Sequence, residues 1–319
     1  MFRSALSRQI YFDLAWLNCQ ILYLFLPFLI YLIFFITESA RHCQLMNNAA
    51  HTEPTQHPLN QKFSWRDPEP GRHRRLTDEQ VRGFGEHGFF VLEQAFSQAE
   101  IADVIAAIDP LEQAYERYVS EQQGGHYRLS SSGTITFTAH LVRFSALLKS
   151  FAAHPAFKDV RHDLIGDDVR LYRDQSVYKK TGKVQEFPWH QDNGYTFVEP
   201  QQYLTFWIPL VDVDEENGCP WVAPGLHRLG TLSHWQTDIG LKCLERAPNA
   251  VPVPARAGDA IIFSSLTPHR TGPNLKSGTV RKAYILQYAP DGAYAITPDG
   301  ERIPQNDPER QFSILDQGR

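Results

Sequence analysis

The chain has 319 residues, of which 42% are hydrophobic and 21% are charged. These values are those of an ordinary globular protein with a substantial core, and they exclude disorder along the whole chain. The formal net charge of −5 offers no broad basic surface for nucleic acid, so a small molecule is the expected partner.

The first predicted element is an apolar segment from Leu14 to Ile36, whose 23 residues match the length that spans a bilayer. It is a candidate transmembrane helix and would provide a membrane contact through residues 14–36. Met46 follows it, so residues 1–45 are alternatively upstream sequence that precedes the true start. A signal peptide is the third interpretation, although the apolar stretch exceeds the usual length of such a region.

Residues 46–75 are rich in Asn, His, Pro and Arg without periodicity, and are predicted to be a flexible lead-in to a catalytic domain at residues 76–319. The basic run Arg72-His73-Arg74-Arg75 is interpreted as an exposed linker, because charge runs usually mark solvated segments. Four scattered cysteines form no CxxC pair and favour a reducing compartment. We therefore expect a cytoplasmic catalytic domain, anchored to a membrane if residues 1–45 are translated.

Two helices are predicted at the start of this domain. Each begins with a capping-box pattern, Thr77 with Gln80 and Ser97 with Glu100, and a strand-like run at Phe89–Leu92 lies between them. The second helix carries an apolar stripe at helical spacing, formed by Ile101, Val104, Ile105 and Ile108. Such a stripe is typical of core packing.

Beyond residue 168 the sequence changes to short apolar or alternating runs that are separated by Gly, Pro, Asn and Asp. The predicted strands are Val169–Tyr178, Tyr203–Val213, Ala260–Ser264 and Val280–Tyr288, with turns at Asn217-Gly218, Pro224-Gly225 and Gly272-Pro273. This pattern favours a sandwich or jelly roll over alternating βαβ units. The domain is therefore predicted to be mainly β with flanking helices.

His190 and Asp192 stand two residues apart, so on an extended segment both side chains project to the same side. His269 follows 77 residues after Asp192, beyond an apolar strand. Two imidazoles and one carboxylate on one face of an octahedral ion are typical of non-haem Fe(II) oxygenases, and they leave three positions for a bidentate 2-oxo acid and O₂. Chance is the alternative, because the chain has 13 histidines. His227, in a turn, is interpreted as structural.

Arg281 lies 12 residues after His269, in a strand pattern that gives it the same face as Ala283 and Ile285. A guanidinium among inward-facing apolar residues costs several kcal/mol unless it is paired, so we expect it to meet an anion. Its planar fork suits the distal carboxylate of 2-oxoglutarate. The alternative is an arginine at an exposed strand edge that pairs with Asp or Glu.

From about Leu76 to Pro290 the sequence resembles the phytanoyl-CoA dioxygenase (PhyH-like) family of Fe(II)/2-oxoglutarate-dependent oxygenases. Ordered blocks at compatible spacing carry the resemblance. They are Leu76-Thr77-Asp78-Glu79-Gln80, Gly88-Phe89-Phe90-Val91-Leu92, Pro188-Trp189-His190-Gln191-Asp192, Trp207, Glu216-Asn217-Gly218, Pro224-Gly225-Leu226-His227, Gly258-Asp259, His269-Arg270-Thr271-Gly272-Pro273-Asn274 and Arg281. Leu226 departs from the pattern, since the family has a small polar residue there.

The resemblance implies a double-stranded β-helix, a cupin-like jelly-roll barrel, with Fe(II) near its mouth. It assigns the metal to His190, Asp192 and His269, and 2-oxoglutarate to Arg281. Further co-substrate positions implied by the family are Gln175, Thr271, Trp207 and Lys179. The region Gly124–Leu148, where family members place substrate contacts, does not align. The substrate and the oligomeric state are therefore left open.

The predicted function is hydroxylation of a C–H bond in a small organic molecule, with 2-oxoglutarate and O₂ as co-substrates and succinate and CO₂ as products. Two alternatives remain at this point. One is a membrane-tethered jelly-roll protein that binds or senses a ligand without turnover. The other is a zinc-dependent cupin-like enzyme.

Overall fold

The computed structural model describes residues 53–68, 73–182 and 186–318. The chain divides into two units, residues 1–53 and 54–319, and the fold described below is that of the second unit. The predictions for residues 14–36 and for a start at Met46 lie outside the described residues. Within the described ranges, no helix is long and apolar enough to cross a membrane.

A nine-stranded antiparallel sheet forms the base of the domain, in the order β1-β13-β8-β15-β5-β4-β3-β2, with β18 paired to β5. Its strands are Phe89–Leu92 (β1), His126–Tyr127 (β2), Ser130–Ser131 (β3), Ile135–Ala139 (β4), Val169–Lys180 (β5), Leu204–Pro209 (β8), Ala260–Ser264 (β13), Val280–Pro290 (β15) and Ser313–Leu315 (β18). The predicted strand Tyr203–Val213 was too long. β8 ends at Pro209, and the N–H of Leu210 makes one further hydrogen bond to the carbonyl of Lys282 on β15 at 3.0 Å.

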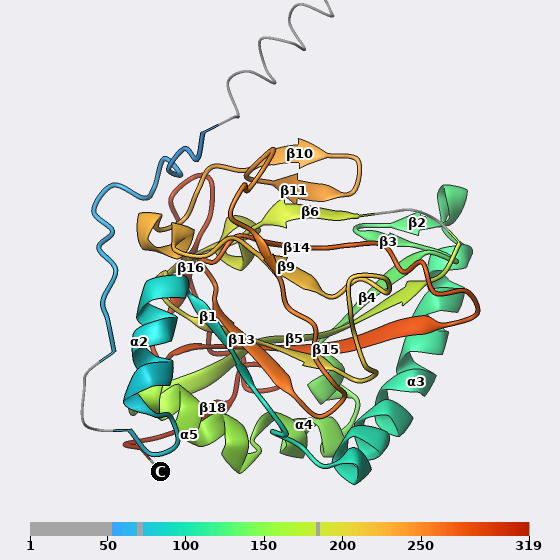
Figure 1. The fold of residues 1–319 in the computed structure, drawn as a ribbon, viewed down its shortest axis with the longest axis horizontal. Coiled ribbons are helices and arrows are strands. Elements are labelled where there is room, and N and C mark those ends of the chain that lie inside the picture. Colours follow the sequence, from blue (N-terminus) through green and yellow to red (C-terminus); the bar gives the residue numbers. More distant parts are fainter. Residues whose placement is uncertain (1–52, 69–72, 183–185, 319) are drawn as a thin grey trace, which may run out of the picture. The chain divides into compact units, whose positions relative to one another are not determined.

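A four-stranded sheet, in the order β12-β9-β14-β6, lies across from the large sheet (Figure 1). Its strands are Phe187–His190 (β6), Pro220–Val222 (β9), Val251–Pro252 (β12) and His269–Thr271 (β14). Smaller pairings join Phe197–Glu199 (β7), Tyr294–Ile296 (β16) and Arg302–Pro304 (β17), and Trp235–Thr237 (β10) with Gly240–Lys242 (β11). Two antiparallel sheets that enclose an interior confirm the predicted jelly roll.

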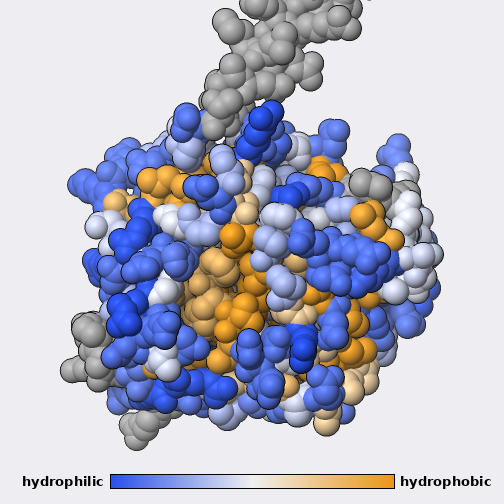
Figure 2. Space-filling view, in the orientation of Figure 1, coloured by the Kyte–Doolittle hydropathy of each residue, from blue (hydrophilic) through white to orange (hydrophobic). Residues whose placement is uncertain are grey.

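The large sheet is buried on both faces. Along β15, Tyr284 and Leu286 pack into the core on the helix side, whereas Ala283 and Ile285 belong to the cluster between the two sheets. This alternation follows from the two-residue period of a strand. Figure 2 shows hydrophobic residues gathered in the middle of one face, over β1 and β13, with hydrophilic residues around them.

Helices cover the outer face of the large sheet (Figure 1). The described α-helices are Asp78–His87 (α2), Gln98–Ser120 (α3), Ala146–Ala152 (α4) and Pro155–Leu164 (α5). Both predicted capping boxes are confirmed, at Thr77 with Gln80 and at Ser97 with Glu100. Thr77 and Ser97 also have the extended backbone of an N-cap residue, so these local patterns begin the helices where the sequence predicts.

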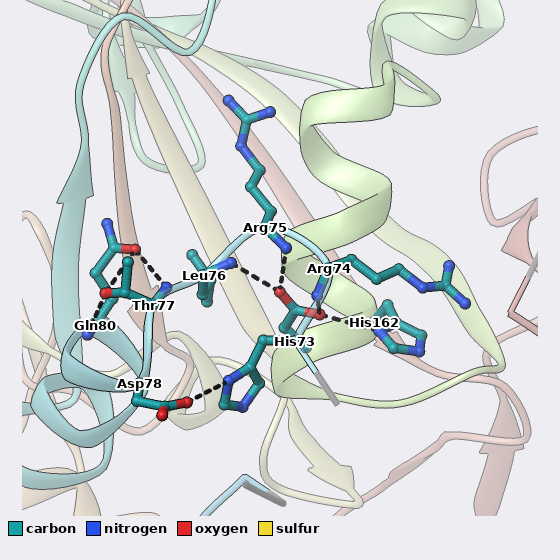
Figure 3. Close-up of polar contacts among 9 residues, drawn as sticks. His73, Arg74, Arg75, Leu76, Thr77, Asp78, Gln80 and His162 are labelled. Carbon is teal, nitrogen blue, oxygen red and sulfur yellow. Dashed lines mark hydrogen bonds and ion pairs between the residues drawn. The ribbon is translucent and has the colours of Figure 1, made fainter. Parts of the chain in front are cut away.

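The described part of the basic run before α2, residues 73–75, is held by the buried carboxylate of Asp163 in α5. Asp163 accepts hydrogen bonds from the backbone N–H groups of Arg74, Arg75 and Leu76 at 2.8, 3.0 and 3.0 Å, and it also contacts the ring of His162 (Figure 3). Burial opposes ionisation of Asp163, but these hydrogen bonds outweigh it and hold its pKa below the usual range. The basic residues thus mark an anchored turn.

Residues 54–68 also make specific contacts with the domain. The ring of His57 stacks on Phe197 with centroids 4.8 Å apart, and Asn60 Nδ2 donates to the carbonyls of Leu229 and Thr231 at 2.8 and 3.0 Å. This differs from the predicted flexible lead-in, because the buried acceptors come from residues far along the chain and no local pattern reveals them.

Asp163→Asn should lower the free energy of unfolding at pH 7 by about 1–3 kcal/mol, because buried N–H donors lose their charged acceptor. The Asp163 pKa is depressed, so the stabilisation is present above the unfolded value of about 3.9 and is lost as the pH falls through the native pKa. Urea unfolding of both proteins between pH 7 and pH 3 checks this. Asp103→Asn, at an exposed position of α3, is the matched control. A difference that does not change with pH would contradict the assignment.

Candidate metal centre

Strand pairing brings the two histidines together. His190 is the last residue of β6, His269 is the first residue of β14, and the two residues are direct partners in the antiparallel register. Their ring centroids lie 4.1 Å apart. Asp192 opens the 3₁₀ turn Asp192–Gly194 after an extended Gln191, and the ligand atoms of the three residues all lie within 4.8 Å of one another.

A backbone carbonyl orients each imidazole. His190 Nδ1 lies 2.8 Å from the carbonyl of Pro188, and His269 Nδ1 lies 3.0 Å from the carbonyl of Thr267. Because a carbonyl only accepts, each Nδ1 carries the proton and each Nε2 keeps a free lone pair for a metal. Burial, and then the proximity of His269, hold the pKa of His190 well below its usual range, which favours the neutral, ligating form.

Asp192 is oriented by a hydroxyl from the large sheet. Thr205 Oγ1, on β8, donates to Asp192 Oδ2 at 2.5 Å. Carboxylate ligands of metals commonly have such a supporting hydrogen bond. Because one oxygen accepts from Thr205, Asp192 can offer the other to an ion.

The two neighbours of Asp192, Gln191 and Asn193, have buried amide side chains that hold this segment in place. Gln191 donates to the carbonyls of Gly230 and Leu266 at 3.0 and 2.5 Å and accepts from the N–H of Leu232 at 2.6 Å. Asn193 donates to Thr231 Oγ1 at 2.6 Å. The turn that carries Asp192 is therefore tied to residues 230–232 and 266, which fixes the carboxylate relative to both histidines.

The donor set suits a divalent transition metal that accepts nitrogen and oxygen ligands on one face. Among the described residues, His190, Asp192 and His269 form the single group of three His, Cys, Asp or Glu side chains close enough to hold an ion. His227 lies apart from this group. It is fully buried, its Nε2 is 3.1 Å from the carbonyl of Gly85, and its ring contacts Trp65, as expected for a structural histidine.

Arg281 is buried without an anionic partner. It is 1% exposed, its Nη1 donates to the carbonyl of Val177 at 3.3 Å, and its guanidinium lies over the ring of Trp207 at 5.3 Å. Nε and Nη2 have no hydrogen-bond partner in the described structure. Burial lowers the pKa of Arg281 to about 10, so the group is still charged at neutral pH. An unpaired buried charge of this kind fits a carboxylate ligand.

A cavity of about 110 Å³ connects the triad with Arg281. Gln175, Thr271 and Trp207, the co-substrate positions that the family resemblance implies, line it. Lys179 does not. Its Nζ donates to Thr271 O and Oγ1, both at 3.0 Å, and to Gly272 O at 2.6 Å. Lys179 therefore supports Thr271 from behind, and all three of its donors are used.

Several lining residues were missed from the sequence. Leu129 and Phe137 come from the region Gly124–Leu148 that could not be aligned. Thr205 and Arg173 are single polar residues within strand patterns, and no neighbouring motif singles them out. Only the pairing of strands distant in sequence brings them to the cavity.

The family profile described as phytanoyl-CoA dioxygenase (PhyH) matches residues 84–283. The chain is 26% identical over 249 residues to a methylphosphonate hydroxylase of Gimesia maris, an alignment that covers 72% of this chain and 92% of that protein. It is 24% identical over 260 residues to an ectoine dioxygenase of Bordetella bronchiseptica, with 72% and 82% covered.

Solved structures share the fold. EctD from S. alaskensis, solved with 2-oxoglutarate and 5-hydroxyectoine, superposes with a TM-score of 0.57 at 22% identity, covering 78% of this chain and 86% of that one. A non-heme α-ketoglutarate-dependent carbocyclase from nogalamycin biosynthesis gives a TM-score of 0.59 at 23% identity, with 71% and 89% covered. These likenesses support the jelly-roll fold.

Thr205→Val should weaken metal affinity by about 10–100-fold, because the carboxylate of Asp192 loses the hydrogen bond that orients it. Thr205→Ser keeps the hydroxyl and should bind almost normally. Calorimetric titration of the purified apoprotein with Fe(II) under anaerobic conditions measures the affinities. The matched control is Thr138→Val, at a buried threonine whose hydroxyl has no partner in the described structure. Equal affinities in Thr205→Val and the wild type would refute this role.

Proposed function

The chain belongs to the phytanoyl-CoA dioxygenase (PhyH) family and is an Fe(II)/2-oxoglutarate-dependent dioxygenase, and we propose that it hydroxylates a C–H bond of a small organic molecule. In this proposal His190, Asp192 and His269 hold Fe(II), and Arg281 binds the distal carboxylate of 2-oxoglutarate. The balanced reaction consumes substrate, 2-oxoglutarate and O₂ and yields hydroxylated substrate, succinate and CO₂.

The observation that carries the proposal is the convergence of the triad and an unpaired buried guanidinium on one cavity. A metal site alone would also suit a zinc enzyme, and an arginine alone would suit many anion sites. A dicarboxylate that chelates the metal at one end needs a cation at the other end, and Arg281 supplies it.

When bound, iron(II) and 2-oxoglutarate supply the activation of O₂ and the oxidising power for the C–H bond. The protein's own residues position the co-substrate and keep water away from the site. We propose that Gln175 and Thr271 donate hydrogen bonds to the co-substrate from opposite walls of the cavity. Lys179 donates to Thr271 Oγ1, so the hydroxyl proton of Thr271 is left for donation into the cavity.

The apolar wall has a separate role. Phe187, Trp207, Phe263 and Ile285 line the cavity beside the triad and limit the water that can reach it. Exclusion of water strengthens the interaction of Arg281 with a carboxylate and protects the oxidising site from side reactions.

The binding module without turnover and the zinc-dependent cupin-like enzyme predict different outcomes from this oxygenase. A module that only binds its ligand would form no succinate with any metal. A zinc enzyme would be active with Zn(II) and would not consume 2-oxoglutarate. The free Nε and Nη2 donors of Arg281 beside the triad favour a site that binds a carboxylate next to the metal.

His190→Ala should reduce succinate formation to the background level, because the metal loses one of its three protein ligands. Succinate is measured by chromatography after incubation with Fe(II), 2-oxoglutarate and O₂. His126→Ala, at an exposed histidine on β2, is the control and should keep wild-type turnover. Full turnover by His190→Ala would refute the ligand assignment.

Arg281→Ala should raise the apparent KM for 2-oxoglutarate by at least about tenfold, because loss of a buried charged contact costs about 2–5 kcal/mol. The neighbouring Lys282 provides the control, since it faces the helix side and pairs with Asp109 at 2.8 Å. Lys282→Ala should change stability and leave this KM unchanged. Initial rates of succinate formation against 2-oxoglutarate concentration give both values. An unchanged KM in Arg281→Ala would exclude the proposed contact.

A further inference from the structure

A second arginine, Arg173 of β5, lines the same cavity as the metal triad. It is exposed, and it makes no hydrogen bond or ion pair with another described residue. The nearby arginines differ in this respect, because Arg143 pairs with Glu309 at 2.5 Å and Arg310 pairs with Asp307 at 2.8 Å. Arg173 is therefore an available cation at the solvent side of the cavity.

A β-bulge directs Arg173 into the cavity. On β15, Gln287 pairs with Arg173 and the next residue, Tyr288, pairs with Leu171, so Tyr172 is an extra residue on β5. In a regular strand Arg173 would share the face of Leu171, which packs into the core on the helix side. The bulge reverses this, and both Tyr172 and Arg173 line the cavity. Bulges often re-aim side chains next to active sites.

The charges of the loaded site leave Arg173 uncompensated. Among the described lining residues, the charged side chains are Arg173, Asp192 and Arg281. The two charges of Fe(II) and that of Arg281 are balanced by Asp192 and the two carboxylates of 2-oxoglutarate. The ammonium of Lys179 adds a further positive charge behind Thr271, where its N–H groups donate to oxygens of Thr271 and Gly272. Among the charged lining residues, Arg173 is the cation at the solvent side of the cavity, and it is left for the molecule that is oxidised.

The carboxylate next to Arg173 in sequence is engaged elsewhere, because Asp174 Oδ2 accepts from the N–H of Val142 and from the hydroxyl of Tyr284. Burial, and then the charges of Arg173 and Arg310, lower the pKa of His140 to about 4, so this neighbouring histidine is neutral at pH 7. Asp307 is close as well, but it pairs with Arg310, so the guanidinium of Arg173 stays available to an anion.

The position of Arg173 relative to the metal suits a substrate contact. Thr205, Gln287 and Arg173 lie side by side across β8, β15 and β5, so Arg173 is about 10 Å from Thr205, which supports the ligand Asp192. Arg281 is six residues from Gln287 along β15, or about 20 Å of strand. Co-substrate and substrate would therefore approach the metal from opposite ends of the cavity.

From this placement we infer that Arg173 binds the acid group of the primary substrate, which is a small organic anion such as a carboxylate or phosphonate. The inference rests on the proposed function, because it assigns the part of the cavity that 2-oxoglutarate leaves free. A guanidinium binds carboxylate and phosphonate oxygens bidentately, so it both selects the acid and fixes its orientation. The C–H bond that reacts then lies a few bonds from the acid group.

The test compares acids with their neutral amides or ester. Equilibrium dialysis against the anaerobic Fe(II) and 2-oxoglutarate complex measures binding of phenylacetate, hexanoate and methylphosphonate, and of phenylacetamide, hexanamide and dimethyl methylphosphonate. Wild type should prefer at least one acid over its neutral partner by tenfold or more. Arg173→Gln should remove this preference, and Arg173→Lys should retain part of it. Arg82→Gln, at an exposed arginine on α2 that lies outside the cavity, is the matched control.

Equal binding of every acid and its neutral partner by wild type would overturn the inference, as would an acid preference that persists in Arg173→Gln. The proposed function is tested separately in the same proteins. Arg173→Gln should keep wild-type affinity for 2-oxoglutarate, whereas Arg281→Ala should lose it. If wild type neither binds 2-oxoglutarate nor forms succinate, the proposed function fails. If it does both but shows no acid preference, only the inference about Arg173 fails.

Discussion

Burial of the central strands on both faces is the constraint on which the rest of this structure depends. β8, β13 and β15 present every second side chain to the helices and the others to the smaller sheet. The helix side supplies the main apolar core, so the opposite face can carry groups that a core does not tolerate. Thr205 and Arg281 occupy that face. The stability of the fold and the chemistry of the cavity are thus divided between alternate residues of the same strands.

The charges on that inner face are the second constraint. Burial of an unpaired guanidinium or carboxylate in an apolar cavity costs desolvation free energy. Arg281 and Asp192 line the same cavity but do not form an ion pair with each other. A metal ion and a dicarboxylate would compensate both groups. The bound molecules would therefore neutralise charges that the protein leaves uncompensated. The side chains of Arg281 and Asp192 are already in place to bind them.

The triad is held by contacts that reach well beyond it. Gln191 connects the Asp192 turn to residues 230–232, and Asn60 from the start of the domain bonds to the same stretch. The N-terminal residues therefore contribute to the surroundings of the metal site, although they lie far from it in sequence.

The sequence by itself determined the features that depend on local periodicity and on motif residues. These are the two capped helices and the strands β1 and β13 with their bounds, whose signals are short-range. The ordered blocks that resemble a known family added the prediction that His190, Asp192, His269 and Arg281 belong to one site, and the structure places all four around one cavity. The tertiary structure alone decided that Lys179 supports Thr271, that Thr205 orients Asp192, and that a bulge turns Arg173 into the cavity. Each of these depends on the register between strands distant in sequence. The sequence of one strand does not predict that register.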